Sequence, residues 1–292
     1  MTEYHTLKNL QELSTILGKE VWEIIQQADM EECERTAEQS YEKMLEMYLA
    51  MKEADACYDG SLVSASGRAG GDGDKIHQYN EQQANLCGPF VGKVMEKAIK
   101  MGESNACMRR IVAAPTAGSC GVLPAVLLSY AEDFPTGEEQ MVQALYVAAG
   151  IGKVIAENAF IAGAAGGCQA EIGSAAAMAA GALAYLQGGD SETILHAAAL
   201  SLKNMLGLTC DPVAGLVEVP CIKRNAYGAV NALASAQLAL AGIRSAIAPD
   251  DVIDSMRRIG NQMHKSLKET GEGGLAICAS ARDYIHMPSS FQ

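Results

Sequence analysis

IGSAAAMAAGALAYL, residues 172–186, is the most apolar stretch of this 292-residue chain, and the fold class follows from it. It carries no charged side chain and consists mostly of alanine and glycine, and alanine is the strongest helix former. The run is shorter than the roughly 20 apolar residues that a helix needs to cross a bilayer. The stretch therefore predicts a buried helix, with no membrane as a partner.

Helical patterns continue on both sides of this stretch. Residues 3–55 read as two amphipathic helices, because apolar positions such as Leu10 and Leu13 recur at helical spacing. From about residue 90 to residue 268, further segments rich in Ala, Leu and Gly follow, and only residues 109–113 have the β-branched character of a short strand. We therefore expect an all-α fold, a single helical domain over the whole chain.

Composition divides this expected domain, residues 1–292, into four parts. They are an N-terminal helical segment over residues 1–56, a glycine-rich loop over 57–89, a core over 90–274 and a tail over 275–292. The loop contains SLVSASGRAGGDGDK, whose glycine clusters and small polar residues do not favour a regular helix. Long loops in compact proteins are usually functional or disordered. The tail has no clear periodicity, and we expect a loop or a docked extension there.

Several residues carry the signals of helix starts. Thr136 followed by Glu139 has the spacing of a capping box. Asp190 and Ser191 are candidate N-caps for a later helix, and Pro249 suits the first turn of the last long one.

Charge and cysteine usage exclude several classes of protein. The formal net charge of -13 would repel nucleic acid and anionic lipid surfaces. The N-terminus, MTEYHTLKNLQELSTIL, is polar and carries acids, so it lacks the pattern of a secretory signal and predicts a cytoplasmic protein. The 9 cysteines include no CxxC pair, which argues against both a disulfide framework and a zinc finger.

Three segments place reactive groups within the apolar helical body. They are GAAGGCQAEIGS around Cys168, GLTCDPVAGLVEVP around Cys210 and VPCIKRN around Cys221. Pro212 ends any helix that contains Cys210, and Pro220 permits a new helix to begin near Cys221. If Cys168 lies near the start of the apolar helix, three thiolates could meet at one inorganic centre. Their spacing in sequence matches no general metal motif.

Four stretches resemble the α chain of bacterial iron–sulfur L-serine dehydratases. They are GGCQAEIGSA, NMLGLTCDPVAGLVEVPCIKRNA, IVAAPTAGSCGVLPAVL and ETGEGGLA. The resemblance implies that Cys168, Cys210 and Cys221 hold a [4Fe–4S] cluster whose fourth iron lacks a protein thiolate when substrate is bound. An iron with an open position is a Lewis acid. The implied activity is that of an L-serine ammonia-lyase, which eliminates water from L-serine to give pyruvate and ammonia.

Candidate substrate contacts come from three parts of the chain. PTAGSCG, residues 115–121, offers backbone N–H groups near a helix start, where an anion is favoured, although a plain turn and cap would look the same. Positive charge after the third cysteine would favour a bound cluster and carboxylate, although these side chains could equally be solvated. The candidates are Thr116, Gly118, Asn158, Ser64, Ser66 and Gly71 for the substrate, and Lys223 and Arg224 for the positive charge.

The general base stays unidentified. His77 is the best placed of the 5 histidines, but a lone loop histidine is usually a surface residue, and His196 reads as a structural group on a core helix. Cys278, close to GGLA, is a candidate for the removable cysteine that occupies the open iron in single-chain relatives. The other five cysteines are interpreted as structural: Cys33, Cys57, Cys87, Cys107 and Cys120.

The resemblance also implies a partner. In that family a separate β chain or domain contributes to the active site, and this chain lacks the extra domain that single-chain relatives carry at their N-terminus. We therefore expect a β subunit in a hetero-oligomer. Three alternatives remain open at this point: an L-cysteine desulfidase on the same scaffold, a pyridoxal-phosphate dehydratase, and a helical protein without enzymatic activity.

Overall fold

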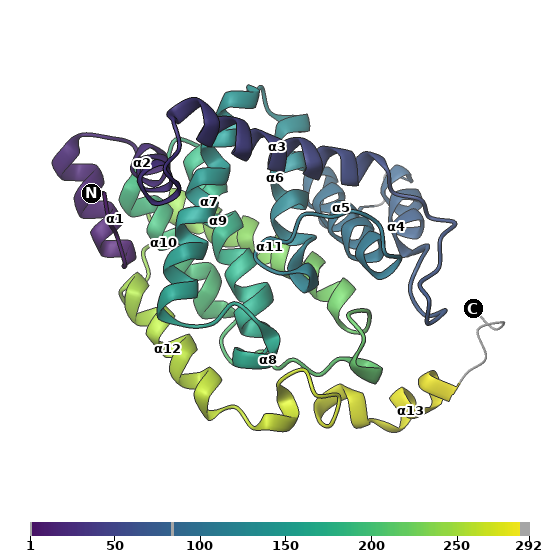
Figure 1. Ribbon diagram of the computed structural model, residues 1–292. Coiled ribbons are helices and arrows are strands. Elements are labelled where there is room, and N and C mark those ends of the chain that lie inside the picture. Colours follow the sequence, from purple (N-terminus) through teal and green to yellow (C-terminus); the bar gives the residue numbers. More distant parts are fainter. Residues whose placement is uncertain (1, 83–84, 287–292) are drawn as a thin grey trace.

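Helices and connecting segments make up the whole described chain. The computed structural model describes residues 2–82 and 85–286 (Figure 1). Its helices are α1 (Leu7–Leu17), α2 (Val21–Cys33), α3 (Ala37–Ala56), α4 (Asp72–Glu81), α5 (Pro89–Ala106), α6 (Val122–Asp133), α7 (Glu138–Asn158), α8 (Gly163–Gly166), α9 (Ser174–Leu186), α10 (Ser191–Asn204), α11 (Cys221–Leu240), α12 (Pro249–Gln262) and α13 (Ala279–His286). The all-α prediction is confirmed. The short strand expected at residues 109–113 is wrong, because these residues form an irregular connection between α5 and α6.

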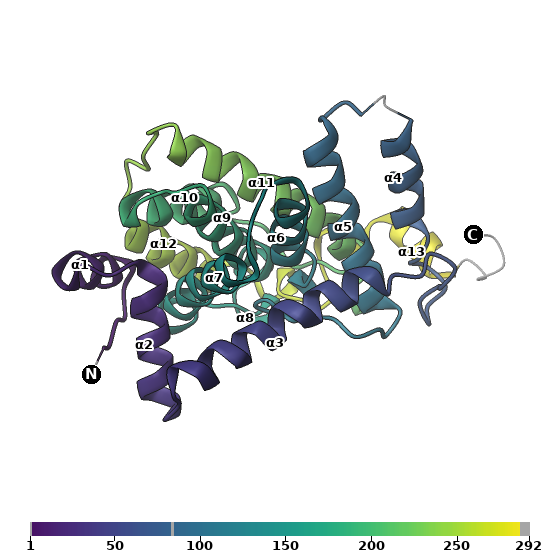
Figure 2. The same ribbon diagram turned by 90° about the horizontal axis from the view of Figure 1, so that it is seen from above.

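Helix α9 lies at the centre of the molecule. It packs against α6, α7, α10 and α11, and the two views show these helices around it (Figures 1 and 2). A methyl group added to Gly181 would come within 2.2 Å of Ile151 Cδ1 on α7, so small side chains are what let the two backbones approach closely. The predicted buried helix is confirmed. Within the part of the chain that the structure describes, no helix is long and apolar enough to span a membrane.

The N-terminal segment forms three helices instead of the predicted two. Gly18 adopts a left-handed conformation (φ 60°) that ends α1, and Thr36 caps the start of α3 by accepting a hydrogen bond from the Gln39 N–H at 3.2 Å. Figure 2 shows α3 running along the outside of the bundle. The three helices therefore form an outer layer over the core.

The loop predicted over residues 57–89 is also partly wrong, because it contains α4. The carboxylate of Glu103 on α5 accepts hydrogen bonds from the backbone N–H groups of Asp72 (2.8 Å) and Gly73 (3.0 Å), which stabilises the start of α4. Among the described residues of this stretch, those before Asp72 and those between α4 and α5 are irregular. The tail likewise contains α13, while residues 287–292 lie outside the described residues.

Two of the three predicted helix starts are confirmed. Asp190 accepts a hydrogen bond from the Thr193 N–H at 2.8 Å, and Pro249 is the first residue of α12. The predicted capping box at Thr136 is wrong by one residue. Helix α7 begins at Glu138, and the Gln140 side chain accepts a hydrogen bond from the backbone N–H of Gly137, which is the N-cap. The hydroxyl of Thr136 donates instead to a carbonyl outside the helix.

Candidate functional site

Three buried cysteines mark the candidate site. Cys168 follows the turn after α8 and precedes the π-helical turn Gln169–Gly173 that leads into α9. Cys210 lies in the connection after α10, and Cys221 is the first residue of α11. Their exposed fractions are 3%, 2% and 8%. The predicted helix start after Pro220 and the predicted place of Cys168 before α9 are both confirmed.

The three thiols affect one another electrostatically. Burial is the largest cause that raises the pKa of Cys168, to about 11, and that of Cys221, to about 12. The pKa of Cys210 is raised by burial first and then by Cys168, with a smaller effect from Cys221. Such mutual influence requires short separations. Because the thiolate is the form that binds metal, the group needs positive charge from a bound species to ionise at neutral pH.

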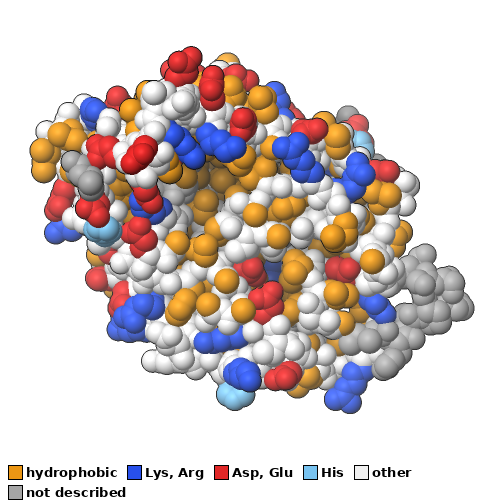
Figure 3. All heavy atoms as spheres, viewed as in Figure 1, with side chains coloured by type: hydrophobic (Ala, Val, Ile, Leu, Met, Phe, Trp, Pro, Cys, Tyr) orange, Lys and Arg blue, Asp and Glu red, His pale blue; other side chains and the backbone are white. Residues whose placement is uncertain are grey.

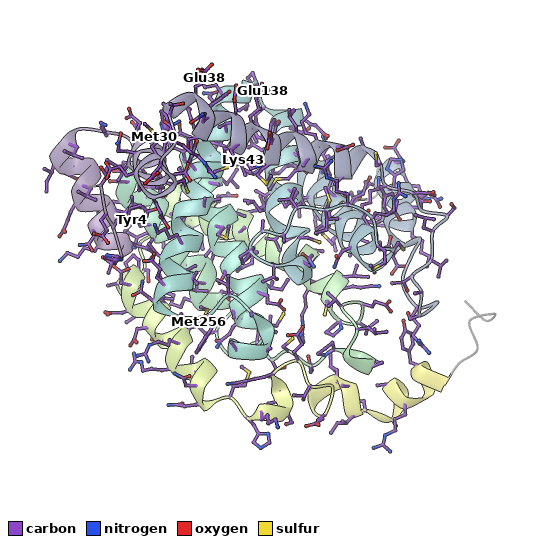
Figure 4. The ribbon with its side chains drawn as sticks, viewed as in Figure 1. Tyr4, Met30, Glu38, Lys43, Glu138 and Met256 are labelled. Carbon is purple, nitrogen blue, oxygen red and sulfur yellow. The ribbon has the colours of Figure 1, made fainter. Side chains whose placement is uncertain are left out.

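Buried amides fix the backbone around these thiols. Gln169, which is fully buried, donates to the carbonyls of Gly166 (2.9 Å) and Met256 (3.1 Å) and accepts from the Gly207 N–H (2.9 Å). These bonds join the Cys168 turn to α12, where Figure 4 labels Met256, and to the segment before the second thiol. The turn is therefore held from three sides.

A second buried amide holds the start of α11. Asn225 donates to the carbonyls of Gly118 (2.9 Å) and Cys221 (3.0 Å), and its oxygen accepts from the Gly121 N–H (2.9 Å). The turn before α6 thus packs against the third thiol. In that turn the N–H groups of Ser119, Cys120 and Gly121 are already bonded within the protein, which leaves fewer donors for a substrate carboxylate than the sequence suggests.

The segment after α12 fixes Cys210. Its backbone N–H donates to Leu267 (2.9 Å), and its carbonyl accepts from the Glu269 N–H (2.7 Å). The neighbouring Asp211 accepts from the Leu275 N–H (2.8 Å). The ETGEGGLA segment therefore forms one wall of the site.

Arg224 supplies positive charge at the thiols. Its guanidinium donates to Asp211 (2.9 Å) and to the Thr209 carbonyl (2.8 Å), and it lowers the pKa of Cys168 against the larger effect of burial. Lys223 points elsewhere, since it pairs with Asp72 and is half exposed. The charge predicted after the third cysteine is therefore provided by one of the two residues.

Sequence reasoning missed Glu171. Its carboxylate accepts a hydrogen bond from Thr116 Oγ1 at 2.9 Å, and a methyl group added to Gly118 would lie 3.2 Å from Oε1. A methyl group on Gly163 would meet Cys210 Sγ at 2.7 Å and Glu171 Oε2 at 2.8 Å. Burial is the main cause that raises the pKa of this carboxyl group. A signal was present in the sequence, because Glu171 is the one charged residue between Glu157 and Asp190.

A family model described as serine dehydratase alpha chain matches residues 17–276, which include all three thiols and Glu171. The chain belongs to this family. The probable L-serine dehydratase alpha chain of Bacillus subtilis is 44% identical over 279 residues, 94% of this chain and 93% of that protein. The L-serine dehydratase alpha chain of Peptoniphilus asaccharolyticus is 39% identical over 274 residues, 93% of this chain and 94% of that protein. The L-serine dehydratase of Streptomyces coelicolor is 47% identical over 182 residues, 62% of this chain and 40% of that protein.

The resemblance to serine dehydratase alpha chains is thereby confirmed, and of the candidate substrate residues Thr116 and Gly118 lie beside Glu171. Ser66 Oγ donates to Glu218 (2.6 Å), which lies shortly before Cys221, and Ser64 Oγ is 3.0 Å from Ser66 Oγ. Gly71 immediately precedes Asp72, the partner of Lys223 on α11. The irregular loop before α4 therefore lies along the start of α11.

Three other candidates form their hydrogen bonds with groups other than the thiols. The exposed Asn158 donates to the carbonyls of His5 (2.7 Å) and Val154 (2.8 Å), so its side chain is occupied at the end of α7. His77 on α4 lies 2.9 Å from a carboxylate oxygen of Glu96 and is half exposed. Cys278 is exposed, and the nearest bond of its sulfur is to the Gly274 carbonyl at 3.7 Å.

A cavity of about 250 Å³ between α2, α3 and α7 contains none of the residues in the thiol segments. Figure 4 labels Tyr4 and Lys43 in its lining. Its cations are paired with carboxylates: Arg35 with Asp29, Lys43 with Glu46 and Lys153 with Glu32. Figure 3 shows basic and acidic side chains on the face where α2 and α3 lie. The cavity is therefore poorly suited to an anionic substrate, and the thiol group remains the candidate site.

Proposed function

We propose that this chain is the catalytic alpha chain of an L-serine ammonia-lyase, which converts L-serine to pyruvate and ammonia, and that Cys168, Cys210 and Cys221 hold a [4Fe–4S] cluster. The proposal is supported by three buried thiols from three segments, which affect one another electrostatically, in a member of the serine dehydratase alpha chain family. The relatives named above as L-serine dehydratases support serine as the substrate.

The donor set fits a cluster better than a single ion. Among residues 2–82 and 85–286, no group of three or more His, Cys, Asp or Glu side chains is arranged to hold one metal ion. A cluster makes a different demand, because each thiolate binds its own iron at a separate corner. Thiolates are the protein ligands of such clusters, and at Gly163 the backbone lies so close to Cys210 Sγ that only a glycine fits there.

Elimination of water from serine needs a base at Cα and an electrophile at the hydroxyl oxygen. When bound, the cluster supplies the electrophile, an iron with an open position. The protein orients the thiols through Gln169 and Asn225 and excludes water by burying them. The Thr116 hydroxyl and the backbone of Gly118 lie on the same side as Glu171, where they would contact the substrate.

The first test measures iron and acid-labile sulfide in anaerobically purified variants. Replacing Cys168, Cys210 or Cys221 by alanine is expected to abolish most of the iron and all pyruvate formation. The matched control is Cys120→Ala, which removes an equally buried thiol outside the group and should leave the iron content unchanged. Retention of iron by all three variants would show that the ligand assignment is wrong.

The second test concerns the leaving group. An L-cysteine desulfidase on the same scaffold would form pyruvate faster from cysteine than from serine under anaerobic conditions. We expect the reverse. A pyridoxal-phosphate enzyme would instead yield a lysine adduct after borohydride treatment, and we expect none, because the described chain offers no parallel sheet, only one isolated bridge between Cys210 and Lys268.

We further propose that the enzyme is a cytoplasmic hetero-oligomer with a β subunit and that it is sensitive to oxygen. Two relatives that match over most of their length are named as alpha chains. These names support the existence of a second kind of subunit. Reduced thiols are required for the cluster, which supports a reducing compartment. Loss of a brown colour and of activity in air would test the oxygen sensitivity.

A further inference from the structure

We propose that Glu171, assisted by Glu269, binds the α-ammonium group of the substrate. This inference rests on the proposed function only in that the substrate is an amino acid seated against the three thiols. It assigns a positioning role to a residue that the thiol motifs do not include.

The geometry places Glu171 at the edge of the thiol group. One carboxylate oxygen is held by the Thr116 hydroxyl at 2.9 Å, while the other faces the same point beside Gly163 as Cys210 Sγ does, at 2.8 Å and 2.7 Å. Only a glycine fits at position 163, because any side chain there would collide with both groups, so the carboxylate and the thiol lie close to each other. Gly118 lies on the other side of the carboxylate, where an added methyl group would be 3.2 Å from Oε1.

The charge around Glu171 is negative, and this carboxylate has no counter-ion within the described chain. Within the described chain, neither Glu171 nor Glu269 forms an ion pair with Lys, Arg or His, and Glu269 raises the pKa of Glu171 by electrostatic repulsion, after the larger effect of burial. Arg224 is already bonded to Asp211.

A partly buried carboxylate without a cation is costly, and a ligand cation would offset that cost. The ammonium group is the cation that serine brings to the site. The carboxylate and hydroxyl of serine are oxygen ligands suited to iron. The ammonium nitrogen of serine therefore needs a different partner, and an anionic residue beside the thiols provides a charge-assisted hydrogen bond to it. The carboxylate of Glu171 is fixed in orientation by Thr116, as a positioning group requires.

The test uses Glu171→Gln in the cluster-loaded protein with its partner subunit. Glutamine keeps an acceptor for Thr116 and removes the charge. Binding is followed by the change in visible absorbance on adding L-serine, or 3-hydroxypropanoate, which lacks the ammonium group. We expect the Kd and KM for serine to rise by about tenfold or more, as loss of a charge-assisted bond implies. The Kd for 3-hydroxypropanoate, kcat and the iron content should remain close to wild type.

The matched control is Glu138→Gln, which removes an exposed carboxylate at the start of α7 and should leave both ligands unaffected. Glu269→Gln should weaken serine in the same direction but less. The inference is overturned if E171Q lowers kcat with no change in the Kd for serine, which indicates a base, or if both ligands weaken equally. If E171Q loses iron, the test depends on E269Q. In that case, a Kd for serine in E269Q that equals the wild-type value overturns the inference.

The two proposals fail separately. A wild-type protein whose serine binding depends on Glu171, but which forms no pyruvate from serine, would refute the dehydratase and leave the ammonium site standing. Pyruvate formation with serine affinity independent of Glu171 would do the opposite.

Discussion

At Gly163 the absence of a side chain lets the backbone lie against both Cys210 and Glu171. An alanine there would place a methyl group 2.7 Å from the sulfur and 2.8 Å from the carboxylate, and overpacking of this kind costs about 1–3 kcal/mol. We expect Gly163→Ala to lower the iron content and the affinity for serine. Gly137→Ala is the control, because no atom lies within 4 Å of its added methyl group. Equal iron content in both variants, measured after anaerobic purification, would contradict this role.

His196 links stability to pH. Burial is the main cause that lowers its pKa from the ordinary 6.5, and Nδ1 accepts the Ser245 N–H at 3.2 Å, which requires the neutral ring. The unfolded state therefore binds the proton more readily, so this contribution to stability is present above pH 6.5 and is lost as the pH falls through the lower folded pKa. His196→Gln should show a smaller fall in the urea midpoint between pH 7.5 and 5.5 than wild type. An identical fall in both proteins would show that another group is responsible.

At the scale of single helices, Asp190 tests whether one local hydrogen bond stabilises the start of α10. Its side chain caps α10, and replacing an N-cap aspartate by alanine typically costs about 1 kcal/mol. Asp190→Ala should therefore lower the free energy of unfolding by that amount without loss of iron. Thr136→Ala provides the comparison, because Thr136 caps no helix, and we expect less than about 0.5 kcal/mol from it. Urea denaturation monitored by circular dichroism measures both, and equal losses would contradict the assignment.

These two residues also show how far the sequence predicts the elements. The buried α9 and the start of α10 follow from composition and from one local bond, so they were predictable. Helix α4 was not, because its start among glycines depends on the carboxylate of Glu103 from another helix. Glu171 was missed for the same reason. Its setting is created by Thr116 and Gly163, which meet it only in the folded chain.

On the scale of the whole molecule, the matched lengths of the relatives bear on the need for a partner. The alpha chains of Bacillus subtilis and Peptoniphilus asaccharolyticus match this chain over more than nine tenths of their length, whereas the Streptomyces coelicolor protein matches over 40% of its own. The latter protein therefore holds much additional sequence in the same polypeptide. If that sequence contributes to the active site, a two-chain enzyme must obtain the same groups from a second subunit.

The thiol group, by contrast, is built wholly from this chain, since Gln169, Asn225 and the wall after α12 all hold the cysteines from within it. We therefore expect this chain to bind the cluster by itself but to need the β subunit for turnover. The isolated chain, reconstituted anaerobically, should contain iron and sulfide but form little pyruvate, and adding the β subunit should restore turnover and increase the mass measured by light scattering. Full turnover by the isolated chain would contradict this expectation, and so would a failure to take up iron without the partner, because the ligand set would then be incomplete in this chain.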